Sequence, residues 1–352
     1  MAIGSKKEDI VEIDSITRRV RHRRTLGGMA LAGALVLVTA CGATSEETSG
    51  ASPEATGPQT LKLTTLGLCN EISVYWAQEK ELFTKHGVKI ELVKSAGGAA
   101  GLTALQSGDV DLAFTNPFST MLAISRGIGL QWIATAYGTP TSEDDGTNSI
   151  AISKDSGITS AKDLEGKTIG VNEVGGINQI ITTAWLKAKG ADPSTVKFVA
   201  LPFAELASAV ASGKIAASQV SAQNLKPELG LKSLGDPFVA AGNGKSLVFA
   251  GYVATTEKSK TLEPAMKGFQ AALIEANEQI KLPENQDERF ALSSSHCKQE
   301  VSMLKTIKEN PYLAEVDTSA LEQMAQLLKD QGMLPDPPTP DTFVPSYVVK
   351  KS

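Results

Sequence analysis

Histidine and cysteine are the side chains best suited to covalent and acid–base chemistry, and this chain of 352 residues holds three of each. The histidines are His22, His86 and His296. His296 precedes Cys297, but neighbours on a helix point about 100° apart, so the two are not arranged as a nucleophile and its base. The cysteines are not clustered, and no metal-ligand spacing occurs. We therefore expect a protein that is not an enzyme and that uses no cofactor and no metal.

Cys41 ends a segment typical of export. A cationic cluster, RRVRHRR at residues 18–24, precedes 15 small or apolar residues, LGGMALAGALVLVTA, at 26–40. Because a membrane-spanning helix needs about 20 apolar residues, this run favours a secretory signal peptide over 1–40. The letters VTAC resemble the bacterial lipobox, which implies cleavage before Cys41 and a lipid on its thiol. The alternative is an ordinary signal peptide followed by a chance cysteine.

Residues 41–59 are predicted to form a lipidated, disordered tether, since they are small, polar and rich in Pro, Gly and Ser. The whole chain has a net charge of −5. Residues 1–40 hold 7 of the 34 Lys and Arg and 4 of the 39 Asp and Glu, which leaves −8 for the remainder. An acidic body argues against nucleic acid as a partner. We expect an exported protein, lipid-anchored to the outer face of the cytoplasmic membrane.

From residue 61, strand and helix patterns alternate. Strands are predicted at 61–67, 88–93, 110–115 and 130–137, with helices at 71–87, 102–107 and 119–126. After a loop at 138–148 the pattern restarts, with strands at 168–172, 196–201 and 215–220 and helices at 177–189 and 204–212. Two similar phrases, LTALQSGDVDLAF (102–114) and ASAVASGKIAASQ (207–219), each close a helix at Ser-Gly and lead into a strand. We predict two similar α/β lobes, each built on a parallel sheet covered on both faces.

The division into lobes follows from the end of the chain. After Lys245 the sequence has one strand pattern and then helical patterns to about residue 333, which a return to the first lobe explains better than a third domain. Lobe one is predicted to comprise 60–153 and 247–352, and lobe two 154–246. Two crossing segments, 150–153 and 247–253, would form the hinge.

Several long stretches together carry a resemblance: VYWAQEKELFTKHGVKIELV, LQSGDVDLAFTNP, DLEGKTIGVNEVGG and LEQMAQLLKDQGML. They resemble the substrate-binding proteins of ABC importers, in the branch for sulfonates, nitrate, taurine and thiamine-pyrimidine precursors. The resemblance implies a type II periplasmic-binding-protein-like fold with two α/β lobes, a two-segment hinge and a helical C-terminal finish. Related pyrimidine-precursor synthases consume one of their own histidines and carry a cysteine-rich metal motif that is missing from this sequence.

The resemblance also implies a function. The chain would capture a small organic or oxyanion solute between its lobes and deliver it to an ABC permease in the membrane. The alternative is an exported ligand-sensing or adhesion lipoprotein on the same fold, not coupled to transport.

Ligand-binding residues are expected in the loops after the strands, because open α/β sheets bind ligands outside the carboxyl ends of their strands. Glycines before a helix let backbone N–H groups approach a ligand, amides and hydroxyls orient it, and aromatic rings form apolar walls. These criteria select Asn70, Gly97, Gly98, Asn116, Phe118, Asn172, Gly175, Gly176, Ser221 and Tyr252. Trp76 and Trp185 lie in amphipathic helices and are expected in the core.

The charge of the ligand follows from the scarcity of arginine. Only Arg126 and Arg289 occur after residue 40, and neither lies where the strand-end loops are expected to converge. A bidentate arginine clamp on a sulfonate is therefore not expected, and we favour a neutral or weakly charged polar organic ligand. A small anion held by helix N-termini remains the alternative. Cys69 and Cys297 can pair in an oxidising compartment or stay as two separate thiols.

Overall fold

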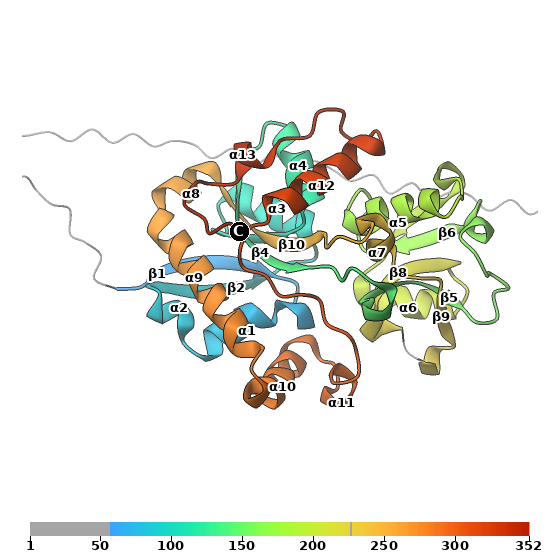
Figure 1. Ribbon diagram of the computed structural model, residues 1–352, viewed down its shortest axis with the longest axis horizontal. Helices are drawn as coiled ribbons and strands as arrows, with labels where there is room; N and C mark the ends of the chain where they lie inside the picture. The colour runs from blue at the N-terminus through green and yellow to red at the C-terminus, as the bar shows by residue number, and fades with distance from the viewer. Residues whose placement is uncertain (1–56, 226, 352) are drawn as a thin grey trace, which may run out of the picture. The chain divides into compact units, whose positions relative to one another are not determined.

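The computed structural model describes residues 57–225 and 227–351; the predicted signal peptide and Cys41 lie outside these ranges. Its first sheet contains β1 (Gln59–Thr65), β2 (Val88–Lys94), β3 (Ala113–Thr115), β4 (Leu130–Gly138) and β10 (Val248–Thr255) (Figure 1). β1 and β2 pair in parallel, and β10 lies between β3 and β4, antiparallel to both. A parallel bridge between Leu63 and Leu112 connects the two groups. The strand order is therefore β2-β1-β3-β10-β4.

The second sheet repeats this order with different strands. It runs β7 (Lys197–Ala200), β6 (Thr168–Val171), β8 (Ala217–Ser221), β5 (Asn148–Ser153) and β9 (Leu231–Ser233). β5 is antiparallel to both neighbours, as β10 is in the first sheet. The prediction of wholly parallel sheets is wrong, because the chain enters the second sheet through β5 and returns to the first through β10, and each of these strands runs against its neighbours.

The repeated phrase of the sequence occupies the same place in both sheets. α3 (Gly98–Ser107) ends at Gly108, and α6 (Phe203–Ala211) is followed by Gly213. Both glycines have a positive φ, 82° and 72°, which residues with a side chain rarely adopt. The strands that follow are β3 and β8, and each is third in the strand order given above, which for β3 includes the bridge between Leu63 and Leu112. The prediction of two similar α/β lobes is confirmed.

Helices cover both faces of each sheet. One face of the first sheet packs against α1 (Ile72–Glu79), α2 (Leu82–Lys85) and α9 (Glu263–Ile280), and the other against α3, α4 (Pro117–Ser125) and α12 (Thr318–Asp330). α5 (Ile177–Ala188) and α6 contribute to separate cores of the second sheet. The single helix predicted over 71–87 is two helices, because Glu81 adopts a left-handed φ of 55° between them.

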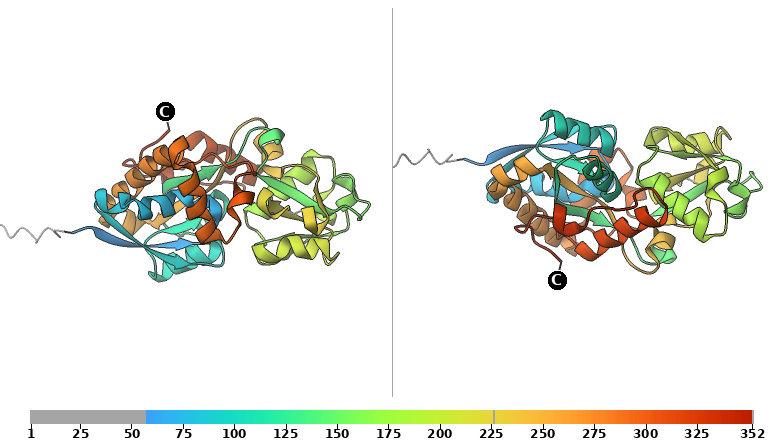
Figure 2. Two further views of the ribbon diagram at one scale, coloured as in Figure 1. Left: turned by 90° about the horizontal axis from the view of Figure 1, so that it is seen from below. Right: turned by 90° about the horizontal axis from the view of Figure 1, so that it is seen from above.

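The helical finish of the chain packs on the first sheet, as predicted, and Figure 2 shows it in orange and red around the blue and teal strands. Besides α9 and α12 it contains α8 (Thr256–Thr261), α10 (Gln286–Cys297), α11 (Val301–Leu304) and α13 (Pro340–Phe343). The sequence patterns missed β9 and α7 (Pro237–Gly242), which are both short. Within 57–225 and 227–351 no helix has the length and apolar character needed to cross a membrane.

Cys69 and Cys297 form a disulfide, with sulfur atoms 2.04 Å apart. It joins the loop after β1 to the last residue of α10, 228 residues further along the chain. Cys69 is buried with Phe290 and Leu304 in a small apolar cluster. Of the two alternatives left open by the sequence, the structure therefore has the bridge.

The two segments that pass between the sheets meet at Thr139 and Leu247. The Thr139 N–H donates to the Leu247 carbonyl at 3.0 Å, and the Leu247 N–H donates to Thr139 Oγ1 at 2.9 Å. Ser246 Oγ donates to the Thr139 carbonyl at 2.6 Å. The predicted crossing 150–153 lies instead within β5, and most of 247–253 lies within β10. The lobe boundaries themselves stay a prediction.

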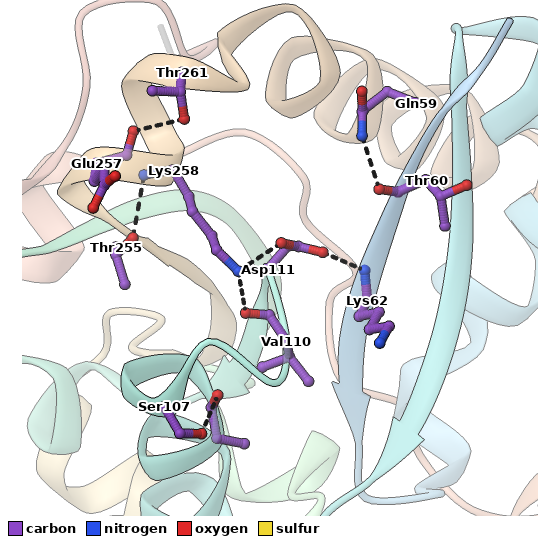
Figure 3. Close-up of polar contacts among 11 residues, drawn as sticks. Gln59, Thr60, Lys62, Ser107, Val110, Asp111, Thr255, Glu257, Lys258 and Thr261 are labelled. Carbon is purple, nitrogen blue, oxygen red and sulfur yellow. Dashed lines mark hydrogen bonds and ion pairs between the residues drawn. The ribbon is translucent and has the colours of Figure 1, made fainter. Parts of the chain in front are cut away.

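Asp111 lies in the first copy of the repeated phrase, just before β3, and its carboxylate connects this segment to β1 and α8 (Figure 3). Its Oδ2 accepts the backbone N–H of Lys62 in β1 at 2.8 Å, and its Oδ1 accepts Lys258 Nζ of α8 at 2.7 Å. Lys258 Nζ also donates to the Val110 carbonyl at 2.8 Å. The carboxylate and the ammonium are both largely shielded from solvent.

Replacing Asp111 with alanine is expected to lower the free energy of unfolding by about 2 kcal/mol, because charge-assisted hydrogen bonds to two elements are lost together. Chemical denaturation of the purified chain measures this loss. Asp109→Ala, two residues earlier, is the matched control, since the exposed carboxylate of Asp109 accepts a single hydrogen bond within the described chain, from the nearby Ser107 hydroxyl. Equal stability of the two variants would contradict the role given to Asp111.

Candidate functional site

A cavity lies where loops from the two sheets meet, with about 420 Å³ of empty space, part of it open to solvent. The first lobe lines it with residues from β3, β4, β10, the loop after β1, the loop after β3 and the start of α3. The second lobe contributes the loop after β6, the start of α5 and the start of α6. The lining residues are Leu66, Leu68, Gly98, Phe114, Thr115, Asn116, Tyr137, Asn172, Glu173, Ile177, Asn178, Phe203, Phe249 and Ala250.

The position of the cavity follows the topology of the sheets. Leu66 follows β1, Asn116 follows β3 and Asn172 follows β6. All three strands point their carboxyl ends at the same region, which is where open α/β sheets bind ligands. The apolar rings and aliphatic side chains among the lining residues form walls, and the amides and the Thr115 hydroxyl supply polar contacts.

Asn116 caps a helix and lines the cavity at the same time. Its Oδ1 accepts the Ser119 N–H at 3.0 Å, and Pro117 takes the first position of α4. Asparagine before a helix and proline at its first turn are both favoured locally, so the sequence Asn-Pro-Phe-Ser starts α4 here. Asn116 Nδ2 donates to Ser119 Oγ at 3.0 Å. Both polar atoms of the amide are therefore held by the helix.

Two lining oxygens have no hydrogen-bond partner in the described structure, and each comes from a different lobe. They are Thr115 Oγ1 and Asn178 Oδ1, whose residues are 2% and 1% exposed. Asn178 Nδ2 donates to Asn172 Oδ1 at 2.7 Å, which fixes the direction of the amide. A buried polar atom without a partner costs about 1–3 kcal/mol. A bound molecule with donors toward both lobes would remove that cost.

Glu71 supports the loop that carries Leu66 and Leu68. Its Oε1 accepts the backbone N–H groups of both residues at 3.0 Å, and its Oε2 accepts the Thr65 hydroxyl at 2.7 Å. Complete burial raises the pKa of Glu71 to about 7, against the effect of these hydrogen bonds. The loop shape at this edge of the cavity thus depends on one buried carboxyl group.

Three of the residues selected from the sequence, Gly98, Asn116 and Asn172, line the cavity. Gly97 lies beside it as the N-cap of α3. Gly176 is the N-cap of α5, and Gly175 lines a different groove, further out.

The other selected residues do not line the cavity. Phe118 and Tyr252 are at most 1% exposed and belong to the cores of the first lobe. Asn70 lines a small pocket beside Cys69, and Ser221, at the end of β8, accepts a hydrogen bond from Asn224. As expected, Trp76 and Trp185 are buried.

Arg126 borders a groove outside the inner cavity. It lines an outer groove of about 1020 Å³ of empty space, open to solvent, together with Ser119 of its own helix and Glu173 and Gly175 of the second lobe. Arg126, at the far end of α4, and the loop after β6 therefore border the same groove. Arg126 does not line the inner cavity.

Sequence reasoning missed Thr115, Glu173 and Asn178 as individual site residues. Thr115 looked like the last residue of a strand, and Asn178 like the first turn of a helix. All three lie within one or two residues of a strand end or a helix start. This position could have indicated them, but many residues that bind no ligand share it. Among the described residues, no group of three or more His, Cys, Asp and Glu side chains is placed to hold a metal ion.

Comparison with known proteins gives a family match and a fold match. Residues 69–280 match the family model described as NMT1/THI5 like. A Haemophilus influenzae protein named as a thiamine biosynthesis protein is 22% identical over 267 residues, which are 74% of this chain and 82% of that protein.

Solved structures with the same fold share little sequence with this chain. The alkanesulfonate-binding protein SsuA of Xanthomonas axonopodis pv. citri, bound to MOPS, has a TM-score of 0.68 at 17% identity, covering 82% of this chain and 99% of its own. The periplasmic nitrate-binding protein NrtA of Synechocystis PCC 6803 has a TM-score of 0.65 at 15% identity, covering 81% and 84%. At this identity the likeness concerns the fold.

Proposed function

The chain belongs to the NMT1/THI5-like family, and on this premise we propose that it is the extracytoplasmic solute-binding component of an ABC importer. It would capture a small organic or oxyanion solute between its lobes and deliver it to a membrane permease, without chemical change of the solute. Lipidation of Cys41 would hold it at the outer face of the cytoplasmic membrane.

One observation carries this proposal: within 57–225 and 227–351 the cavity has a buried oxygen without a hydrogen-bond partner from each lobe, Thr115 Oγ1 and Asn178 Oδ1. A solute that binds both oxygens gains contacts with both lobes only when the lobes are closed on it. Ligand binding therefore stabilises the closed form, with bending at the paired crossings of Thr139 and Leu247. The sulfonate-binding and nitrate-binding neighbours support the same mode of action.

A thermal-shift screen of the purified chain against sulfonates, nitrate, pyrimidines, amino acids and aromatic carboxylates tests the proposal. A ligand at about 100 times its Kd should stabilise the folded chain by about 2.7 kcal/mol. A flat response to every small solute would contradict solute capture and favour a sensing or adhesion lipoprotein.

Replacing Thr115 with valine, which has nearly the same shape, is expected to weaken binding of the screened ligand about tenfold without loss of stability. Among the residues that the structure describes, the Thr115 hydroxyl has no partner to lose, while a bound solute would lose one hydrogen bond. Calorimetric titration gives the Kd, and chemical denaturation gives the free energy of unfolding.

Thr64→Val is the matched control for Thr115→Val. Thr64 is equally buried, but its Oγ1 accepts the Phe114 N–H at 2.8 Å, and it does not line the cavity. Thr64→Val should therefore lose about 1–3 kcal/mol of stability. If Thr115→Val loses as much, or binds with an unchanged Kd, its hydroxyl is not a ligand contact.

A further inference from the structure

Glu173 reaches from the second lobe to the start of a helix in the first. It lies in the loop after β6 and lines both the inner cavity and the outer groove. Its Oε2 lies beside Gly97, the N-cap of α3, where a Cβ atom would be 3.6 Å from it. Burial raises the pKa of Glu173, and the nearby backbone N–H of Ala99 acts in the opposite direction. The carboxylate thus faces the first turn of a helix that belongs to the other lobe.

Glycines on both sides make room for this side chain. In its own loop, a Cβ atom on Gly176 would lie 3.1 Å from Glu173 Cβ and 3.3 Å from its Cγ and Cδ, tighter than most real contacts. Gly97 flanks the carboxylate on the side of the first lobe. Two glycines selected from the sequence for close approach to a ligand therefore pack against a carboxylate of the chain itself.

The start of α3 is a natural position for a negative charge. Its N-cap is Gly97, which has no side chain to accept hydrogen bonds, and the first intrahelical bond is donated by Gly101. The N–H groups of the first turn therefore need an outside acceptor, and the helix dipole favours an anionic one. Glu173 places a carboxylate oxygen beside these groups from the opposite lobe.

The described residues that line the inner cavity include a negatively charged side chain and no positively charged one. Among its lining residues, all within the described chain, Glu173 is the only one that carries a charge, and none is Lys, Arg or His. Arg126 lines the outer groove and not the inner cavity. An anionic solute in the cavity would meet a carboxylate and find no cation, whereas a cationic or hydrogen-bond-donating solute would find an acceptor.

We propose that Glu173 determines the charge selectivity of the cavity, because its carboxylate already occupies the helix end that an anionic solute would use. The cavity then rejects sulfonate-like and carboxylate solutes and accepts neutral or cationic ones with N–H donors. This inference rests on the proposed solute-binding function and specifies which class of solute that function serves.

Calorimetric titration with sodium ethanesulfonate, at constant ionic strength, tests the inference on the wild-type chain and on Glu173→Gln. Glutamine keeps the size of the side chain and removes its charge, so Glu173→Gln should bind ethanesulfonate at least tenfold more tightly than the wild type. Glu173→Ala, which also opens space, should show the same gain. Nicotinate and nicotinamide, a charged and a neutral molecule of one shape, provide a second pair: only nicotinate should bind more tightly to Glu173→Gln.

Glu91→Gln is the matched control, because it changes the net charge equally at an exposed position of β2 that lines neither space. It should bind every probe as the wild type does. Equal ethanesulfonate affinity of wild type, Glu173→Gln and Glu173→Ala, all folded by circular dichroism, overturns the inference. If a solute from the screen still binds the wild type, that result leaves the proposed function unaffected. A screen that finds no ligand would contradict both the proposed function and the inference on Glu173.

Discussion

Replacing Cys69 and Cys297 together by serine is expected to lower the free energy of unfolding by about 2–5 kcal/mol. The bridge closes a loop of 228 residues, so the unfolded chain gains much conformational freedom when it is lost. Part of the small apolar cluster around Cys69, with Phe290 and Leu304, is lost as well. Chemical denaturation of the double variant beside the wild type measures the effect.

Reductant provides the control for the disulfide. Dithiothreitol should shift the denaturation midpoint of the wild type to that of the double variant and leave the double variant unchanged. Because Cys69 directly follows Leu68, which lines the cavity, reduction should also weaken the binding of a screened ligand. If dithiothreitol leaves the denaturation midpoint of the wild type unchanged, the disulfide does not stabilise the fold.

Local patterns in the sequence were sufficient to predict the two lobes. The helix ends at Gly108 and Gly213 and the strands after them are determined by neighbouring residues, and the repeated phrase shows that both lobes use the same step. The antiparallel strands β5 and β10 were not predicted as such, because strand direction depends on where the chain crosses between lobes. Local sequence patterns do not show where the chain passes from one lobe to the other.

The site was predictable at the level of loops and not of side chains. The rule that ligands lie at the carboxyl ends of strands led to Gly98, Asn116 and Asn172, which line the cavity. The criterion of glycines before a helix led to Gly97 and Gly176, which flank Glu173, and their contact with a ligand stays a prediction. Contacts between a loop of one lobe and a helix of the other depend on the tertiary arrangement, and a single sequence carries no periodic signal for them.

The other large effect concerns a glycine whose role only packing reveals. Gly268 lies in the middle of α9, where glycine is normally unfavourable, and alanine in its place would ordinarily add about 1 kcal/mol of stability. Here a Cβ atom would clash with the His86 carbonyl oxygen and would lie 2.7 Å from Val88 Cγ2. We expect Gly268→Ala to lower the free energy of unfolding by about 3 kcal/mol.

The direction of the stability change in Gly268→Ala distinguishes the steric clash from the higher helix propensity of alanine. His86 and Val88 are fixed by the end of α2 and the start of β2, so relief of the clash requires α9 to move away from the buried core of the first lobe. Gly242→Ala is the matched control, since Gly242 is also helical but a Cβ there would meet Leu247 Cγ at an ordinary 3.6 Å. Thermal denaturation should show a lower Tm for Gly268→Ala and an equal or slightly higher one for Gly242→Ala. A rise for both would mean that helix propensity outweighs the close approach of α9 to β2.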